Sequence, residues 1–381
     1  MTPKYEKKLI YVLNYVSADD TQHYVHVLRL LAELVDLGWK VVVISEKGGE
    51  GSRNVLGHDV RFMSKRGGVE RLFRLAGTLV SLRRQGYRLV FVRISRPAIL
   101  VSSIVGRIVG QRTMYWLSSA NQDLDQAKVG WRRGIYKVTM AATLTLINKF
   151  VTGPETMAAY FKLALSIPEE KLMVLYNDVD LSRFSPVPKT ANPGTPTRIL
   201  FVHSLSPNKE ASRYFPDLIA CLSSVSNRLG NIRLDVIGEG PERQVLETIA
   251  GKAGGGLVVE FLGGVPNMAI VNHYARADIF IMPSYREGFP RVVVEAMAMG
   301  LPIVATDAGG TRDLFGEKQQ AFIVSRDDPA AFAAKLVDLV SDPIKRSELA
   351  QENLARVQRY STKAVARMYN SKLLSVLEES R

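Results

Sequence analysis

Short apolar runs recur along the whole chain, separated by longer segments in which apolar residues follow a helical spacing. Runs rich in Val, Ile and Leu are typical of strands in parallel sheets that helices cover on both faces. The runs lie at residues 9–15, 40–45, 88–94, 113–117, 150–153 and 171–176, then at 198–203, 233–238, 258–264, 278–284, 302–307 and 321–325. This pattern predicts an α/β protein with two doubly wound parallel-sheet domains of about six strands each.

The segment SPVPKTANPGTPT, residues 185–197, separates the two sets of runs. It is rich in Pro and Thr and has no apolar periodicity, which indicates a linker. We therefore expect an N-terminal domain over residues 1–186 and a C-terminal domain over 187–361. A helix of about residues 362–381 can pack back on the first domain. In such folds ligands bind beyond the carboxyl ends of the strands, so we expect the site in the cleft between the domains.

Two segments of the first half have one apolar helical face. Residues 20–40 place Val25, Leu28, Leu31 and Val35 on a face that ends before Gly38, which predicts a core helix. Residues 65–86 carry a stripe of Leu72, Leu75, Leu79 and Leu82, flanked by Arg71, Arg74, Arg83 and Arg84. A basic amphipathic helix of this kind can lie on an anionic membrane, and it can equally pack on a core with a basic back.

The net charge of +13 is concentrated in the first half of the chain. Residues 1–190 carry 28 Lys and Arg against 16 Asp and Glu, whereas residues 191–381 carry 22 against 21. From Arg71 to Gln122 there are nine arginines and no acid. Such a field favours an anionic partner, although a solvated basic surface gives the same composition. We expect no nucleic acid, because the segment lacks interleaved surface aromatics for base stacking.

The cysteine content, the first residues and the length of the apolar stretches indicate the cellular compartment of the protein. Cys221 is the one cysteine, so a disulfide framework is excluded and a reducing setting is favoured. The first residues lead directly into a strand, so we expect no cleaved secretory segment. The longest apolar stretches are shorter than the ~20 residues of a membrane-spanning helix. We expect a cytoplasmic protein, peripheral at the inner face of the cell membrane.

Candidate chemistry gathers in REGFPRVVVEAMAMG, residues 286–300. Pro290 fits the first position of a helix, and Gly300 suits its C-terminal cap. Glu287 then lies beside the free backbone N–H groups of the helix start, which attract phosphate or sugar oxygens. Glu295 lies in the apolar second turn, where a buried carboxylate needs a hydrogen-bonding partner, such as the paired hydroxyls of a ribose.

The segment around these acids, residues 283–310, resembles the donor-binding core of the retaining GT-B glycosyltransferases of family 4, with its E-x7-E signature. Four other segments resemble further parts of that family, namely residues 174–186, 198–210, 234–242 and 259–265. The likeness is specific over about residues 150–330 and only architectural before them. It implies two Rossmann-like domains facing across a cleft. It also implies a retaining, metal-independent transfer of a sugar from a nucleotide diphosphate sugar to a glycan or lipid-linked acceptor, in cell-surface polysaccharide or glycolipid synthesis.

The resemblance also implies roles for individual residues. Glu287 and Lys209 would be catalytic, Glu287 by holding the transferred sugar and Lys209 by stabilising the leaving diphosphate. Glu295 would bind the ribose of the nucleotide. The other donor-binding positions would be Ser204, Gly238, Gly240, Val265, Gly288, Phe289, Pro290, Gly309 and Gly310.

The phosphate loop departs from the family pattern. The family usually has Gly-Arg where His203 and Ser204 stand in this chain, so one expected phosphate-binding cation is absent. Donor binding is then weaker, or Arg286 or Arg291 compensates for the missing cation, or activity is lost.

The acceptor side departs as well. Residues 17–23 replace a glycine-rich loop, which makes Asp20 and His23 acceptor-side candidates, although Asp20 can equally cap the next helix. Many relatives place a histidine after the fourth strand, where this chain has Ser118 and Ser119. We keep Ser118 as an acceptor-side candidate, but its hydroxyl cannot replace an imidazole as a base.

No metal and no cofactor besides the sugar-nucleotide co-substrate are expected. The Asp-x-Asp pairs at residues 123–125 and 178–180 lack the surroundings of a metal–nucleotide site, and the histidines lack ligand spacing. A glycoside hydrolase or phosphorylase is disfavoured, because both acids belong to one short segment instead of flanking a bond. The alternative that remains is a catalytically weakened or non-catalytic GT-B protein that binds an anionic partner.

Overall fold

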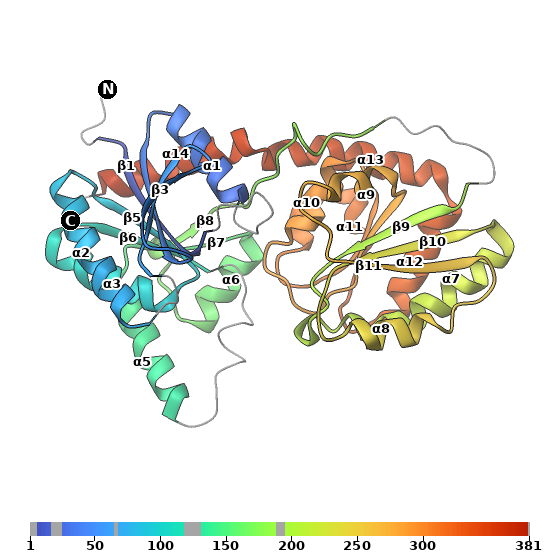
Figure 1. The fold of residues 1–381 in the computed structure, drawn as a ribbon. Helices are drawn as coiled ribbons and strands as arrows, with labels where there is room; N and C mark the ends of the chain where they lie inside the picture. Colours follow the sequence, from blue (N-terminus) through green and yellow to red (C-terminus); the bar gives the residue numbers. More distant parts are fainter. Residues whose placement is uncertain (1–5, 17–24, 65–67, 118–130, 188–194, 380–381) are drawn as a thin grey trace. The chain divides into compact units, whose positions relative to one another are not determined.

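The structure, a computed structural model, describes residues 6–16, 25–64, 68–117, 131–187 and 195–379. The chain divides into two compact units, residues 1–176 with 362–381 and residues 177–361. The first unit includes the C-terminal helix α14 (Thr362–Glu378), which lies against α1 (Val25–Asp36; Figure 1). Residues 177–186, which we had assigned to the first domain, group with the second unit. There the Val179 N–H donates to the Tyr360 carbonyl at 2.9 Å.

The first unit is built on an eight-stranded sheet in the order β3-β4-β2-β1-β5-β6-β7-β8. Its strands are β1 (Lys8–Tyr15), β2 (Lys40–Lys47), β3 (Gly51–Val55), β4 (His58–Phe62), β5 (Leu89–Arg93), β6 (Arg112–Trp116), β7 (Lys149–Thr152) and β8 (Leu172–Val174). Neighbours pair in parallel, except that β3 is antiparallel to β4. The β3–β4 hairpin was not predicted from the sequence, because β3 is polar and mostly exposed and gives no apolar run.

Helices cover both faces of this sheet. The core face packs against α2 (Glu70–Arg84), α3 (Arg96–Val109), α5 (Trp131–Leu146) and α6 (Glu155–Ala164). A 3₁₀ turn, Glu169–Lys171, precedes the last strand. In Figure 1 the other face carries α1 and α14.

Two predictions for these helices need correction. The leucine stripe of α2 faces the core: Leu75, Leu79 and Leu82 are fully buried, and Leu72 is half-buried. The reading in which this stripe lies on a membrane is therefore wrong, and the core-packing reading holds. In α1, Val35 is exposed, and Leu34 contributes to the buried face in its place.

The second unit is built on a six-stranded parallel sheet in the order β11-β10-β9-β12-β13-β14. Its strands are β9 (Thr197–Val202), β10 (Ile232–Ile237), β11 (Leu257–Gly263), β12 (Ile279–Met282), β13 (Ile303–Thr306) and β14 (Ile323–Val324). The order reverses between β9 and β12, which lie side by side. In doubly wound sheets, this reversal opens a crevice at the carboxyl ends of the two strands where ligands bind.

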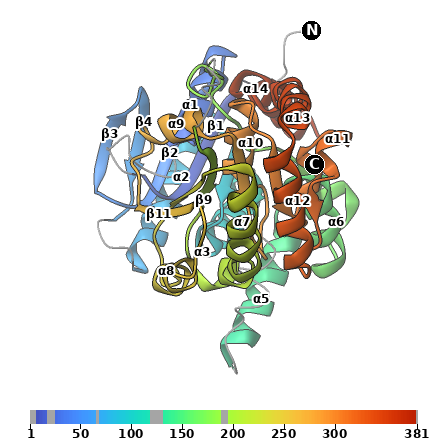
Figure 2. The same cartoon turned by 90° about the vertical axis from the view of Figure 1, so that its right-hand side faces the viewer.

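The helices of the second unit connect these strands. They are α7 (Phe215–Leu229), α8 (Arg243–Ala250), α9 (Ile270–Arg276), α10 (Arg291–Ala298), α11 (Glu317–Gln320), α12 (Pro329–Ser341) and α13 (Pro343–Val357). Short 3₁₀ turns occur at Pro207–Lys209, Ala211–Arg213, Arg312–Leu314 and Gln358–Tyr360. Helices α7 and α12 lie side by side (Figure 2). The prediction of two doubly wound parallel-sheet domains is confirmed.

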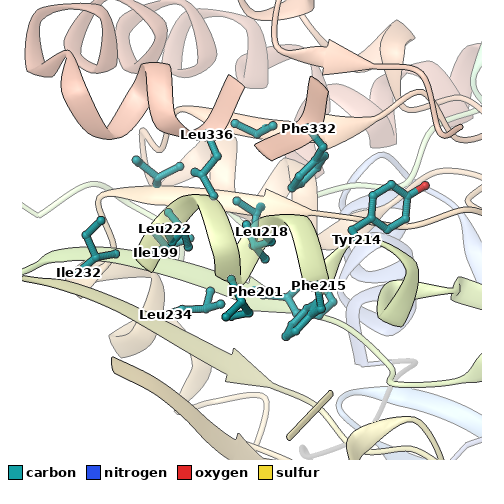
Figure 3. Packing of buried hydrophobic residues seen from close by; sticks show 14 of the residues in the cluster. Ile199, Phe201, Tyr214, Phe215, Leu218, Leu222, Ile232, Leu234, Phe332 and Leu336 are labelled. Carbon is teal, nitrogen blue, oxygen red and sulfur yellow. The ribbon is translucent and has the colours of Figure 1, made fainter. Parts of the chain in front are cut away.

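The core of the second unit packs helices α7 and α12 against its sheet. Figure 3 shows Leu218 and Leu222 of α7 between the strand residue Phe201 and Phe332 of α12, with Phe215 of α7 beside Phe201. All five side chains are buried. Because the strands are fixed in this way, the loops after β9 and β12 begin from defined positions at neighbouring carboxyl ends.

Candidate functional site

The loop between β12 and α10 carries the main candidate. All four residues of β12 are buried, and α10 begins at Arg291. We predicted Pro290 as the first helical residue, but it is the N-cap, and the helix begins one residue later. The ψ of Pro290, 106°, is extended and not helical. Gly300 follows the helix with a φ of +69°, in keeping with the predicted C-terminal cap. The sheet and the helix thus fix both ends of the loop that contains Glu287.

Glu287 is buried, and three donors bind one of its oxygens. Its Oε1 accepts from His203 Nε2 at 2.7 Å, from Lys209 Nζ at 2.8 Å and from Ser284 Oγ at 2.7 Å. Among the residues that the structure describes, no donor lies within hydrogen-bonding distance of Oε2. Oε2 can therefore accept from a ligand hydroxyl while Oε1 holds the side chain in place.

The charge of Glu287 is stabilised by these partners. Burial raises the pKa of the carboxyl, but the positive charges and hydrogen bonds of Lys209 and His203 outweigh burial and lower the pKa to about 2. The side chain is therefore a carboxylate at neutral pH.

Lys209 connects the loop after β9 to the loop after β12. It ends the 3₁₀ turn Pro207–Lys209, and its Nζ also donates to the Arg286 carbonyl at 2.6 Å. In return, the Tyr285 N–H donates to the Lys209 carbonyl at 2.8 Å. The ammonium is thereby held at the switch point of the sheet, where the resemblance places a diphosphate.

His203 is a site residue that the sequence analysis did not select. It directly follows β9, and its side chain is only 8% exposed. In the sequence it stands out only as a departure from the family pattern. Its position could have indicated a place in the site, because the residue after β9 lies close to the loop after the neighbouring strand β12.

Glu295 has its own partners, separate from those of Glu287. Tyr274 Oη donates to Glu295 Oε2 at 3.1 Å, and Arg291 Nη2 lies 3.6 Å from Oε1. Burial raises the pKa of Glu295, and Arg291, Tyr274 and Arg183 offset only part of this effect. The prediction that this carboxylate needs a hydrogen-bonding partner is confirmed, and in the protein alone the phenol of Tyr274 supplies one.

Two of the predicted glycines lie against the backbone of the loop after β9. A Cβ at Gly238 would overlap the His203 carbonyl, and a Cβ at Gly240 would overlap the Leu205 carbonyl. Both glycines have positive φ, of +144° and +154°. The Leu205 N–H donates to the Glu239 carbonyl at 2.9 Å, so the two loops run in register. These glycines therefore set the path of the chain around the site.

The remaining donor-side candidates are placed as follows. The Gly310 N–H donates to the Gly288 carbonyl at 3.1 Å, which joins the loop after β13 to the Glu287 loop, and Gly309 has a φ of +57°. Phe289 is buried edge-on against Tyr360, with ring centroids 5.6 Å apart. Ser204 is exposed beside His203, and Val265 is half-buried in the loop after β11. Phe289 thus supports the turn through packing.

The acceptor-side candidates Asp20, His23 and Ser118 lie outside the described residues. Within the described ranges, no three His, Cys, Asp or Glu side chains come together as metal ligands. In the same ranges, no helix is both long enough and apolar enough to cross a bilayer. The predictions of metal-independence and of the absence of a cofactor stay predictions.

Several arginines of the acid-free segment have structural partners in the first unit. Arg71 pairs with the buried Glu46 at 3.0 Å, and Arg74 pairs with Glu70. Arg83 donates to the Val109 carbonyl at 3.0 Å, and Arg93 stacks on Trp116 at 4.7 Å. Although this segment contains no acid, several of its arginines therefore have partners within the first unit and are not free cations.

Comparisons with known proteins agree with this architecture. Residues 185–356 match the family model described as glycosyl transferases group 1. The chain is 29% identical over 233 residues to a sulfoquinovosyl transferase of Arabidopsis thaliana, an alignment that covers 59% of this chain and 43% of the relative. It is 37% identical over 131 residues to a D-inositol 3-phosphate glycosyltransferase of Corynebacterium urealyticum, covering 34% of this chain and 31% of the relative. The chain thus spans less than half the length of these curated relatives.

Solved structures match over nearly the whole chain. A glycosyltransferase from Rickettsia africae superposes with a TM-score of 0.76 and 16% identity, covering 98% of this chain and all of the other. HepE of Anabaena in complex with UDP-glucose superposes with a TM-score of 0.71 and 17% identity, covering 97% of this chain and 99% of the other. The fold is therefore that of the GT-B glycosyltransferases, with two Rossmann-like domains. Membership of family 4 remains a prediction.

Proposed function

We propose that this protein is a glycosyltransferase that moves a sugar from a nucleotide diphosphate sugar to an acceptor hydroxyl. The observation that carries the proposal is the contact between Lys209 and Glu287 at the switch point of the second sheet. This is where a doubly wound sheet binds its ligand, and it lies within residues 185–356, which match the glycosyltransferase model.

Each group has a task in such a transfer. The Lys209 ammonium would stabilise the charge that the diphosphate gains as its bond to the anomeric carbon breaks. The free Oε2 of Glu287 would accept from hydroxyls of the transferred sugar, and Glu295 would accept from the ribose. The acceptor oxygen forms the new bond to the anomeric carbon, and its proton leaves with the diphosphate. We further propose that the transfer proceeds with retention, as in family 4, and requires no metal.

The acceptor is proposed as a glycan or lipid-linked glycan in cell-surface polysaccharide or glycolipid synthesis. A relative from Bacillus subtilis is named for teichuronic acid biosynthesis, and one from Escherichia coli for colanic acid biosynthesis. These names, together with the sulfoquinovosyl transferase, support a product of this class. The structure describes none of the three acceptor-side candidates, so the acceptor is to be identified by assay.

The test is donor turnover with matched variants. UDP-, GDP- and ADP-sugars are incubated with the protein and a membrane extract, and release of nucleoside diphosphate is measured. We expect turnover of one donor class, a loss of at least 100-fold in Lys209→Gln and Glu287→Gln, and no loss in the control Lys252→Gln, which alters an exposed lysine of the same unit. Release of no nucleoside diphosphate from any of these donors by the wild-type protein would contradict the proposal.

A non-catalytic GT-B protein is the second candidate, and it is favoured by Ser204, which stands where the family has an arginine. It predicts that a nucleotide sugar raises the melting temperature but is neither hydrolysed nor transferred. Turnover of a bound donor that depends on Glu287 would exclude it.

We also propose that the first unit associates with an anionic membrane at the cytoplasmic face. The support is its excess of Lys and Arg, together with exposed Ile108 near the end of α3 and exposed Arg84 at the end of α2. Arg84→Gln with Ile108→Ser should release the protein from vesicles that contain phosphatidylglycerol. Leu163→Ser, at an exposed leucine of α6, is the control. Unchanged sedimentation of the double variant would remove this proposal.

A further inference from the structure

A pocket of about 420 Å³ opens in the first unit, between the β3–β4 hairpin and helix α2. Pockets that bind small molecules have volumes of about 300–1,000 Å³. The described residues that line it are Gly51, Ser52, Arg61, Phe62, Met63, Arg74, Gly77, Thr78 and Ser81. All of them belong to the first unit, whereas Lys209 and Glu287 belong to the second.

The described lining contains two arginines and no acid. Arg61 donates through Nε to Asp59 at 3.4 Å, and its Nη1 and Nη2 have no hydrogen-bond partner among the described residues. Arg74 donates through Nη2 to Glu70, while its Nη1 lies 4.0 Å from Glu50, beyond hydrogen-bonding distance. The three acids are exposed and lie outside the lining. Both guanidinium groups therefore keep N–H donors for a ligand.

The rest of the lining is of mixed chemistry. Ser52, Thr78 and Ser81 contribute hydroxyl groups, and the buried Phe62 and Met63 contribute apolar surface. A guanidinium binds a carboxylate or a phosphate through a fork of two N–H groups. Hydroxyl groups can exchange hydrogen bonds with the hydroxyls of a sugar ring. Together these groups suit a sugar that carries an anionic substituent.

Gly77 keeps the pocket open. It stands in the interior of α2, where glycine lowers helix stability relative to alanine. A Cβ at this position would meet no described atom within 4 Å, so packing within the described chain does not require glycine. Nor does the backbone require it, since Gly77 is not among the glycines with positive φ. A helical glycine with neither of these reasons points to a use for the empty space.

We propose that this pocket binds an anionic sugar unit, with the guanidinium groups of Arg61 and Arg74 on its carboxylate or phosphate. The choice of a sugar rests on the function proposed above. The pocket includes the carboxyl end of β4, and ligands of doubly wound sheets bind at this end of the strands. Because no residue of the donor site lines it, the pocket would hold a unit of the acceptor glycan other than the one that receives the sugar.

The test measures binding to the full-length protein by saturation-transfer NMR. The probes are methyl glucuronide, glucose 6-phosphate, methyl glucoside and glycerol 3-phosphate. We expect the glucuronide or the sugar phosphate to bind about tenfold more tightly than the neutral glucoside, because only they can accept from the arginines. The tighter of the two identifies the anion.

Three variants assign this binding to the pocket. Gly77→Leu fills the pocket, and Arg61→Gln removes a charged donor, so each should weaken binding of the anionic sugar about tenfold. Gly134→Leu is the matched control, because Gly134 is an exposed glycine of helix α5 whose Cβ would also meet open space. Both glycine substitutions raise helix propensity, so both variants should fold. The control should bind as the wild type does.

The outcomes separate this inference from the proposed function. The inference fails if the wild type binds neither anionic sugar, if it binds the glucoside as tightly, or if Gly77→Leu binds like Gly134→Leu. Glycerol 3-phosphate bound as tightly as the anionic sugars would indicate a lipid headgroup and would also overturn it. A protein that binds an anionic sugar in this pocket but releases no nucleoside diphosphate from any donor would support the pocket and contradict the proposed function.

Discussion

Glu287 and Glu295 stand in one loop–helix segment and are both buried, yet the pKa values of their carboxyl groups shift in opposite directions. That of Glu287 is lowered to about 2, because two cationic groups and a hydroxyl surround one of its oxygens. That of Glu295 is raised, because burial outweighs the help of Arg291 and Tyr274. The first acid therefore stabilises the fold as an anion, whereas burial opposes the ionised form of the second. A ribose hydroxyl that donates to Glu295 would favour its ionised form.

This contrast predicts opposite effects of the same substitution at pH 7. Glu287→Gln should lower the free energy of unfolding by about 3 kcal/mol, because it leaves Lys209 and His203 near a neutral amide. Glu295→Gln should leave the melting temperature unchanged or raised, since it removes a charge that burial disfavours, while it weakens donor binding. Thermal unfolding of both variants measures this. Equal destabilisation by the two substitutions would contradict the prediction.

The low pKa of Glu287 also predicts how stability depends on pH. A carboxyl whose pKa is lower in the folded state than in the unfolded chain stabilises the fold above the unfolded value of about 4.3. That contribution, on the order of 3 kcal/mol, is lost as the pH falls toward 2. Urea unfolding from pH 6 to pH 2.5 should therefore show a smaller loss in Glu287→Gln than in wild type. Glu317→Gln, at an exposed acid, should keep the wild-type slope.

Tyr274 is predicted to position Glu295 for the nucleotide. Tyr274→Phe removes the hydroxyl that donates to Glu295 Oε2, so the free energy of unfolding should fall by about 1–2 kcal/mol. The same change removes a hydrogen bond that lowers the pKa of Glu295, so that pKa should rise further. Donor affinity should then decline at low pH, with its midpoint moved upward relative to wild type. Tyr15→Phe, at a partly exposed tyrosine of the first unit, is the control. An unchanged pH profile in Tyr274→Phe would exclude the positioning role.

Gly238 is predicted to tolerate no side chain. Gly238→Ala would place a methyl group on the His203 carbonyl at a φ that suits only glycine, so we expect a loss of about 3 kcal/mol and of donor binding. Gly254→Ala adds a methyl group to open space at a residue without positive φ, and should change stability by less than about 0.5 kcal/mol. Chemical denaturation of both variants measures the difference. Similar stability in the two would mean that the loop can move away from Gly238.

Much of the fold could be predicted because apolar runs report buried strands directly. All twelve predicted strands are present, and each begins or ends within a few residues of the predicted place. The β3–β4 hairpin could not be found in this way, because it lies at the sheet edge and leaves polar side chains in solvent. The leucine stripe of α2 had two readings, since a core and a bilayer both select leucine at the same spacing. Its burial against the first sheet was needed to choose between them.

For the site, Glu287, Lys209 and Glu295 were selected through the family resemblance. That resemblance gave no sign that His203 and Lys209 bind the same oxygen of Glu287. The residues are 84 and 78 positions from that acid along the chain. Their meeting depends on the pairing of β9 with β12.

The sequence by itself determined the elements and the chemistry available to them, because helical and strand periodicity and the identity of each side chain are local properties. Tertiary structure decided which groups meet and in which ionisation state. Strand order brings the loops after β9 and β12 together, and burial at that point strengthens every charge interaction between them. A histidine that the sequence shows only as a replacement for glycine thereby becomes a partner of the central carboxylate.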